Sequence, residues 1–196
     1  MKIGIIGAGN IGATLARKLK TAGHDILIAN SKGPQTLPDV AAETGARPST
    51  IEETVADTQA VILAVPYKAI VQLPTDLFQN RPSSLPIIDT GNYYPMRDGV
   101  IPERDSGLPE TEWVARYFDR PVVKAFNSIS ANSLRRKGSA PGAVSRIALP
   151  VSGDDPAVKL IACGLVECAG FTAVDARPIA ESWPTTRDKC LHNRSG

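Results

Sequence analysis

Short apolar runs alternate with segments of helical spacing along most of the chain. The runs have the length and composition of buried β-strands, and the first segment between them places Ile11, Leu15 and Leu19 on one helix face. The predicted strands cover residues 2–6, 25–30, 60–65, 86–90, 122–126, 146–151 and 171–175. The predicted helices cover residues 10–22, 37–44, 51–56, 67–79 with a break at Pro74, 112–118, 128–136 and 155–169.

This order of elements predicts one α/β domain built on a doubly wound, mostly parallel sheet. Strands that are apolar at nearly every position belong to sheets that helices cover on both faces. Ligands of such sheets bind at the carboxyl ends of the strands. We assign residues 1–183 to this domain and residues 184–196 to a polar C-terminal tail, and we interpret residues 91–110 as a long functional loop.

The first strand leads into a glycine-rich segment, Gly7-Ala8-Gly9-Asn10-Ile11-Gly12, with the pattern G-x-G-x-x-G. Between a strand and a helix, this pattern is typical of dinucleotide binding. Gly7 permits the tight turn, Gly9 lets a pyrophosphate approach the backbone, and Gly12 lets the helix pack closely on the strand. Unpaired N–H groups at the helix start then bind the anion. The segment predicts a Rossmann NAD(P)-binding fold, and the alternative is a purely structural turn.

The end of the second predicted strand favours NADP over NAD. Sheets that bind NAD usually carry Asp or Glu there to bind the ribose 2′-hydroxyl, whereas this chain has Asn30, Ser31 and Lys32. No carboxylate repels a 2′-phosphate, and these side chains can bind one through charge-assisted hydrogen bonds. The alternative is that Lys32 is an ordinary solvated charge.

Composition and charge narrow the remaining function classes. The chain has 196 residues and a net charge of +2, which gives no basic footprint for nucleic acid. We expect no membrane span, because no run approaches ~18 apolar residues. Cys163, Cys168 and Cys190 are interpreted as reduced thiols of a cytoplasmic protein, the first two as buried small residues. No metal site is predicted, because Asp154 and Asp155 precede a helix and are interpreted as its caps.

Several segments carry a resemblance to a known family. They are MKIGIIGAGNIGATLARKL at the N-terminus, followed by ANSKGP, AVPYKAI, DTGNYYPMRDG and VVKAFNSI. Together they resemble the NADPH-dependent coenzyme F420 reductase (F420:NADP oxidoreductase) family and, more distantly, the N-terminal domain of pyrroline-5-carboxylate reductases. The resemblance implies hydride transfer between NADPH and a deazaflavin, coenzyme F420, or a flavin-like partner that lies against the nicotinamide.

The resemblance also implies which residues contact the coenzyme. The pyrophosphate contacts fall on Ala8, Gly9, Asn10 and Ile11. The 2′-phosphate contacts fall on Asn30, Ser31 and Lys32. The contacts near the nicotinamide fall on Val65, Pro66, Asn92 and Ala125. Relatives usually continue with further structured chain where this sequence has residues 184–196, which do not resemble that continuation.

No catalytic residue is predicted, because hydride transfer mainly needs positioning and the exclusion of water. Tyr67, Tyr93 and Tyr94 are candidates for donors or stacking groups beside the coenzyme, or for packing within the loop. Asp89 is interpreted as a partner of loop amides. Lys124 is interpreted as an edge lysine whose ammonium group reaches solvent.

Other interpretations stay open from the sequence. Asn127 and Ser128 either face the nicotinamide or cap the next helix. The chain is a reductase of a flavin-like partner, a sensor or regulatory module that binds NADP without turnover, or a small imine or ketone reductase. The expected partner is a small-molecule hydride acceptor or donor, and a homodimer formed through residues 91–110 or the tail is a further expectation.

Overall fold

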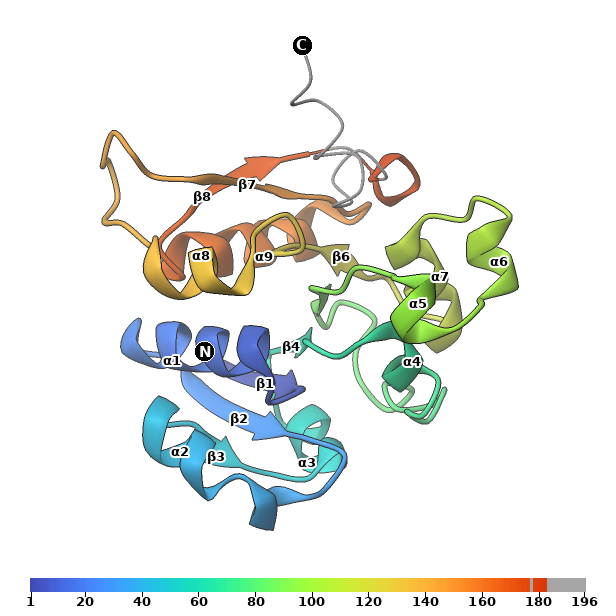
Figure 1. The fold of residues 1–196 in the computed structure, drawn as a ribbon, viewed down its shortest axis with the longest axis horizontal. Helices are drawn as coiled ribbons and strands as arrows, with labels where there is room; N and C mark the ends of the chain where they lie inside the picture. Colours follow the sequence, from blue (N-terminus) through green and yellow to red (C-terminus); the bar gives the residue numbers. More distant parts are fainter. Residues whose placement is uncertain (177, 183–196) are drawn as a thin grey trace.

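The computed structural model describes residues 1–176 and 178–182, and within them six parallel strands form a main sheet (Figure 1). Its strand order is β3-β2-β1-β4-β5-β6. The strands are β1 (Lys2–Ile6), β2 (Asp25–Ala29), β3 (Arg47–Pro48), β4 (Ala60–Leu63), β5 (Ile87–Asp89) and β6 (Val123–Lys124). The chain moves outward from β1 to β3, then returns to the other side of β1, so the predicted doubly wound α/β fold is confirmed.

Helices cover both faces of the main sheet. They are α1 (Asn10–Thr21), α2 (Pro38–Thr44), α3 (Ile51–Ala56), α4 (Tyr67–Ile70), α7 (Glu110–Phe118), α8 (Ala131–Arg136) and α9 (Pro156–Cys168). One core lies under α1, α2, α8 and α9, and a second core lies under α3, α4 and α7. Successive strand residues point into opposite cores, as Ile5 and Ile6 do. This is why the strands are apolar throughout.

A second sheet continues the main one at its β6 edge. Within the described part of the chain, it consists of β7 (Ala148–Val151) and β8 (Thr172–Asp175), which pair in parallel. It joins β6 through an antiparallel bridge in which Lys124 and Ser152 exchange backbone hydrogen bonds of 2.8 and 3.0 Å. The whole arrangement is therefore mostly parallel, as predicted.

The predicted helix over residues 67–79 is wrong beyond Ile70, where α4 ends. Pro74 has no N–H group to donate, and the chain continues in turns up to β5. The carbonyl groups of Phe78, Arg81 and Pro82 accept hydrogen bonds from the Arg120 guanidinium group. A side chain distant in sequence therefore holds the turns that lie between α4 and β5.

Residues 91–110 are more ordered than the predicted loop. They contain α5 (Pro95–Asp98) and α6 (Pro102–Asp105), and α7 begins at the last of them, Glu110. Both short helices begin with proline, which suits the first turn because the N–H group it lacks has no partner there. The 3₁₀ helices η1 (Pro34–Thr36) and η2 (Ile179–Glu181) complete the described elements.

Candidate functional site

The three glycines of the G-x-G-x-x-G segment meet different surroundings. Gly7 has φ = +112°, and a Cβ atom there would collide with the Ala64 carbonyl group. A Cβ atom on Gly12 would overlap the Gly7 carbonyl oxygen. Gly9 has an ordinary extended backbone, and a Cβ atom on it would meet nothing within 4 Å. The fold itself requires glycine at positions 7 and 12, whereas glycine at position 9 keeps open the space in front of α1.

That space faces the N-terminus of α1. Gly9 is the N-cap residue, no side chain caps the helix, and its first turn carries no acidic residue. The first N–H groups of a helix have no partner within it, and the helix dipole adds positive potential at that end. A pyrophosphate therefore fits the segment both in shape and in charge.

A cavity of about 460 Å³ begins at this segment and runs along the carboxyl ends of the main strands. Its lining comes from the loops after β1, β4, β5 and β6 and from the start of α8. The lining residues are Gly9, Asn10, Ile11, Ala64, Val65, Pro66, Thr90, Gly91, Asn92, Tyr94, Arg97, Phe126, Asn127, Ser128, Ile129, Ser130 and Ala131. The volume lies within the range of small-molecule sites.

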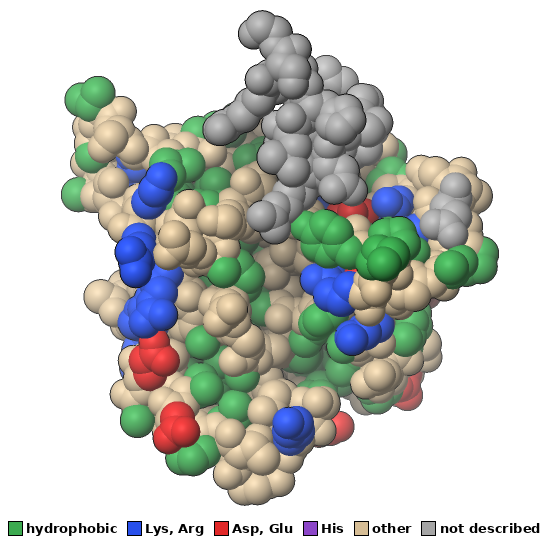
Figure 2. All heavy atoms as spheres, viewed as in Figure 1, with side chains coloured by type: hydrophobic (Ala, Val, Ile, Leu, Met, Phe, Trp, Pro, Cys, Tyr) green, Lys and Arg blue, Asp and Glu red, His purple; other side chains and the backbone are tan. Residues whose placement is uncertain are grey.

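The electrostatics of this region suit an anionic ligand. The described lining includes no carboxylate, and it includes the cation of Arg97, which is ion-paired with the buried Asp98 carboxylate (2.7 Å). On the face shown in Figure 2, which is viewed as in Figure 1, Lys and Arg side chains lie both over α1 and α8 and over the region of α5. Positively charged side chains beside a cleft raise the local concentration of a negatively charged ligand.

The predicted 2′-phosphate residues lie together at the end of β2. The side chain of Asn30 is used within the turn: its amide donates to the Thr36 hydroxyl (2.9 Å), and its oxygen accepts from the Lys32 N–H (2.9 Å). Ser31 and Lys32 are exposed. Residues 29–37 contain no acid, so the donors that remain for a phosphate at this corner are mainly those of Ser31 and Lys32.

The predicted nicotinamide contacts are brought together, with one exception. Val65, Pro66 and Asn92 line the cavity. Ala125 does not: it is fully buried, and its N–H group donates to the Asp89 carbonyl (3.1 Å). The cavity wall at this strand end is formed by Phe126 and the residues after it, because Phe126 adopts φ = +64° and turns the chain toward the cavity.

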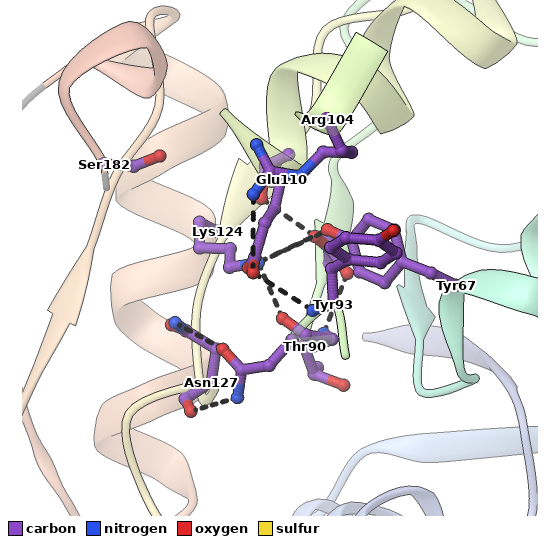
Figure 3. Close-up of polar contacts among 12 residues, drawn as sticks. Tyr67, Thr90, Tyr93, Arg104, Glu110, Lys124, Asn127 and Ser182 are labelled. Carbon is purple, nitrogen blue, oxygen red and sulfur yellow. Dashed lines mark hydrogen bonds and ion pairs between the residues drawn. The ribbon is translucent and has the colours of Figure 1, made fainter. Parts of the chain in front are cut away.

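Asn92 and Asn127 connect the loops after β5 and β6 across the cavity floor. The Asn92 amide donates to the Asn127 carbonyl (2.9 Å), and the Asn127 amide donates to the Asn92 side-chain oxygen (3.3 Å) (Figure 3). The cap of α8 is Ser130, whose hydroxyl accepts from the Ser133 N–H. Of the two readings of Asn127, the structure therefore supports the position at the cavity.

The interpretation of Lys124 as a solvent-reaching edge lysine is wrong. The bridge to Ser152 covers its strand, and its side chain is only 2% exposed. Its ammonium group donates to the Gly91 carbonyl (2.6 Å), Glu110 (2.9 Å) and Asp89 (3.2 Å). Three acceptors use its three hydrogens, so this lysine is a fully paired buried cation.

Lys124 belongs to a buried polar cluster behind the cavity floor, which also contains Asp89, Glu110, Thr111 and Tyr67 (Figure 3). Asp89 accepts from the Gly91 N–H, as predicted, and also from the hydroxyl groups of Tyr67 and Thr111, both at 2.8 Å. The Arg104 guanidinium group lies 4.0 Å from Glu110. Asp89 and Lys124 occupy paired positions on β5 and β6. The sequence indicated only that each lies in a predicted strand, and nothing there indicated Glu110 as their partner.

Of the three candidate tyrosines, two are buried and one lines the cavity. Burial and the Asp89 carboxylate raise the pKa of Tyr67 well above its ordinary value, so its hydroxyl stays a donor. Tyr93 is buried, and its hydroxyl donates to the Gly99 carbonyl (2.7 Å). Tyr94 lines the cavity, and the Arg97 guanidinium group lies 4.9 Å from its ring centre. Of the three, Tyr94 is therefore the one placed to contact a ligand.

The remaining candidates have structural roles. Asp155 caps α9 as predicted, and Asp154 accepts from the Ile179 N–H. Cys163 is half-buried and Cys168 is exposed, so the expectation of burial is wrong for Cys168, while Cys190 lies outside the described residues. Within residues 1–176 and 178–182, His, Cys, Asp and Glu form no group that could hold a metal ion, and no helix is long and apolar enough to cross a membrane.

The doubly wound sheet and its glycine-rich turn define a Rossmann-type nucleotide-binding fold. Residues 2–93 match the family described as NADP oxidoreductase, coenzyme F420-dependent. Over nearly its whole length the chain is 30% identical to a hypothetical protein from Sinorhizobium meliloti, covering 94% of this chain and 88% of that one with a TM-score of 0.77. These findings place the chain among the NAD(P)-dependent oxidoreductases, with residues 2–93 as the part that matches the family model.

Two further solved structures share the fold. One, provisionally assigned as an F420-dependent NADP reductase from Arthrobacter sp., is 21% identical, with 98% of this chain and 90% of that chain covered and a TM-score of 0.71. The 1-pyrroline-5-carboxylate reductase from Streptococcus pyogenes is 17% identical, with 90% and 58% covered and a TM-score of 0.62. No protein of curated function matches the chain significantly.

Proposed function

We propose that this chain binds NADPH and transfers hydride between it and a deazaflavin or flavin-like partner. The observation that carries the proposal is the cavity, which extends from Gly9 at the start of α1 to Tyr94 and Arg97 at the far wall. Its glycine end suits a pyrophosphate, and its far end is lined by the loops after β4, β5 and β6, where the proposal places the second planar ligand.

In this proposal the protein positions two ligands and keeps water out. The coenzyme supplies the hydride when bound. The N–H groups of Asn10 and Ile11 bind the pyrophosphate, and Ser31 and Lys32 bind the 2′-phosphate. Val65, Pro66 and Asn92 hold the nicotinamide, with Phe126 in the place first expected of Ala125. No side chain is assigned as a proton donor, because the residues of this chain would act by holding the two ligands in place and excluding water.

Coenzyme choice gives the first test. With Ser31→Ala and Lys32→Asp together, the affinity for NADPH should fall at least tenfold, because charge-assisted hydrogen bonds are lost and a carboxylate then repels the 2′-phosphate. The affinity for NADH should stay within about twofold, and calorimetry with both nucleotides measures the difference. The exchange Lys137→Asp, at an exposed lysine after α8, is the matched control. Equal losses for both nucleotides would refute the 2′-phosphate assignment.

The acceptor is tested by following NADPH oxidation at about 340 nm with coenzyme F420, FMN and a cyclic imine. We expect turnover with the deazaflavin or the flavin. Turnover with the imine alone would favour the second candidate, to which the fold of 1-pyrroline-5-carboxylate reductase points, although this chain spans only 58% of that protein. Tight NADPH binding without turnover would identify a sensor. Analytical ultracentrifugation tests the proposed homodimer.

A further inference from the structure

The segment that carries Asn92 is held from behind at three points. The Gly91 carbonyl accepts from the Lys124 ammonium group at 2.6 Å, and the Tyr93 N–H donates to Glu110 at 3.1 Å. These two groups belong to the peptide units on either side of Asn92. Lys124 and Glu110 are themselves paired at 2.9 Å, so one buried ion pair fixes both peptide units. Arg97 adds a bond to the Asn92 carbonyl (2.6 Å).

The ion pair itself takes no part in lining the cavity. The side chains of Lys124 and Glu110 are 2% and 5% exposed, and neither belongs to the cavity wall. In Figure 3 the two side chains point toward one another, Lys124 from β6 and Glu110 from α7. They therefore do not line the space for a ligand, and their contact with the site is made through the backbone they hold.

We propose that Lys124 and Glu110 are positioning residues for the nicotinamide end of the cavity. They fix the peptide units around Asn92, whose side chain is then locked against Asn127 at the floor. The inference rests on the proposed function, because it takes the nicotinamide to lie at Asn92. The buried pair therefore supports the nicotinamide end of the coenzyme site. The pyrophosphate end is built on β1 and α1.

The test compares NADPH with 2′-phospho-ADP-ribose, which lacks the nicotinamide. In Lys124→Met, calorimetry should show NADPH binding weakened roughly tenfold, the effect of losing about one well-placed hydrogen bond. Binding of 2′-phospho-ADP-ribose should change less than about twofold. The fluorescence of bound NADPH should also move toward that of the free coenzyme, because its ring is held less firmly.

Arg146→Met is the matched control. Arg146 is also a buried cation, and it donates to the carbonyl groups of Glu167 and Phe171 (2.8 and 2.9 Å) without lining the cavity. Its loss should lower stability and leave the ratio of the two affinities unchanged.

If Lys124→Met does not fold, Glu110→Gln is the second test variant, because the amide oxygen can still accept from the Tyr93 N–H, whereas the amide NH2 group in place of the other oxygen can no longer accept from Lys124. We then expect NADPH binding to weaken about threefold more than that of 2′-phospho-ADP-ribose. Equal weakening of both ligands, or none of either, would overturn the positioning role. Failure of the wild-type protein to bind either nucleotide would instead reject the proposed function, so the two failures are distinguishable.

Discussion

Gly9→Ala should leave the protein folded and strongly weaken its binding of NADPH. The added methyl group meets no protein atom within 4 Å, and the backbone at Gly9 is one that alanine adopts freely. It occupies the space that a pyrophosphate needs against the start of α1. Overpacking of this kind costs about 1–3 kcal/mol, so the affinity should fall roughly tenfold to a hundredfold, measured by calorimetry with circular dichroism as the check on folding.

Gly12→Ala is the matched comparison, and it should act on the fold. Its methyl group would overlap the Gly7 carbonyl oxygen, a backbone atom that cannot move without opening the contact between α1 and β1. We expect a lower melting temperature or an unfolded chain. If Gly9→Ala bound NADPH as the wild type does, the pyrophosphate would lie elsewhere and the assignment of the glycine-rich segment would fail.

Lys124→Met should be among the most destabilising single substitutions in the described part of the chain. It leaves the carboxylates of Asp89 and Glu110 buried without the cation that bonds to both. Breaking a buried ion pair in this way costs about 3–5 kcal/mol, which corresponds to a fall in melting temperature of roughly 6–20 °C for a chain of this size. Thermal and urea denaturation measure the loss.

Two comparisons separate charge from packing. Lys137→Met, at an exposed site after α8, should change stability by less than about 0.5 kcal/mol. Adding Asp89→Asn and Glu110→Gln to Lys124→Met removes the uncompensated charges and should restore part of the lost stability. If Lys124→Met unfolded no more easily than Lys137→Met, the buried cluster would contribute nothing to the fold.

Regular patterns made the sheet predictable from the sequence. The strands β1, β2 and β4 are apolar at successive positions because they face two cores, and this is visible without any tertiary information. The helix predicted beyond Ile70 is replaced by turns, and two carbonyl groups of that segment, those of Phe78 and Arg81, bind Arg120, about 40 residues away in the sequence. A contact of that kind leaves no periodic trace in the chain.

The candidate site also has one part that the local sequence predicts and other parts that depend on contacts between distant residues. The glycine-rich segment is local, and its spacing alone indicated the turn and the role of each glycine. The buried cluster is not local: Lys124 looked like an edge residue because the bridge from Ser152, which covers its strand, comes from a later part of the chain. Ala125 was expected at the cavity, yet the left-handed backbone of Phe126 shifts the lining by one residue, which strand patterns do not reveal.

The ion pair behind Asn92 also bears on the thermodynamics of binding. A loop that becomes ordered only when its ligand arrives loses conformational entropy at that moment, and the affinity is reduced accordingly. Here the peptide units around Asn92 are immobilised when the chain folds, so that loss is already included in the free energy of folding. Weakening the pair would therefore make the protein easier to unfold and would also make ligand association entropically less favourable.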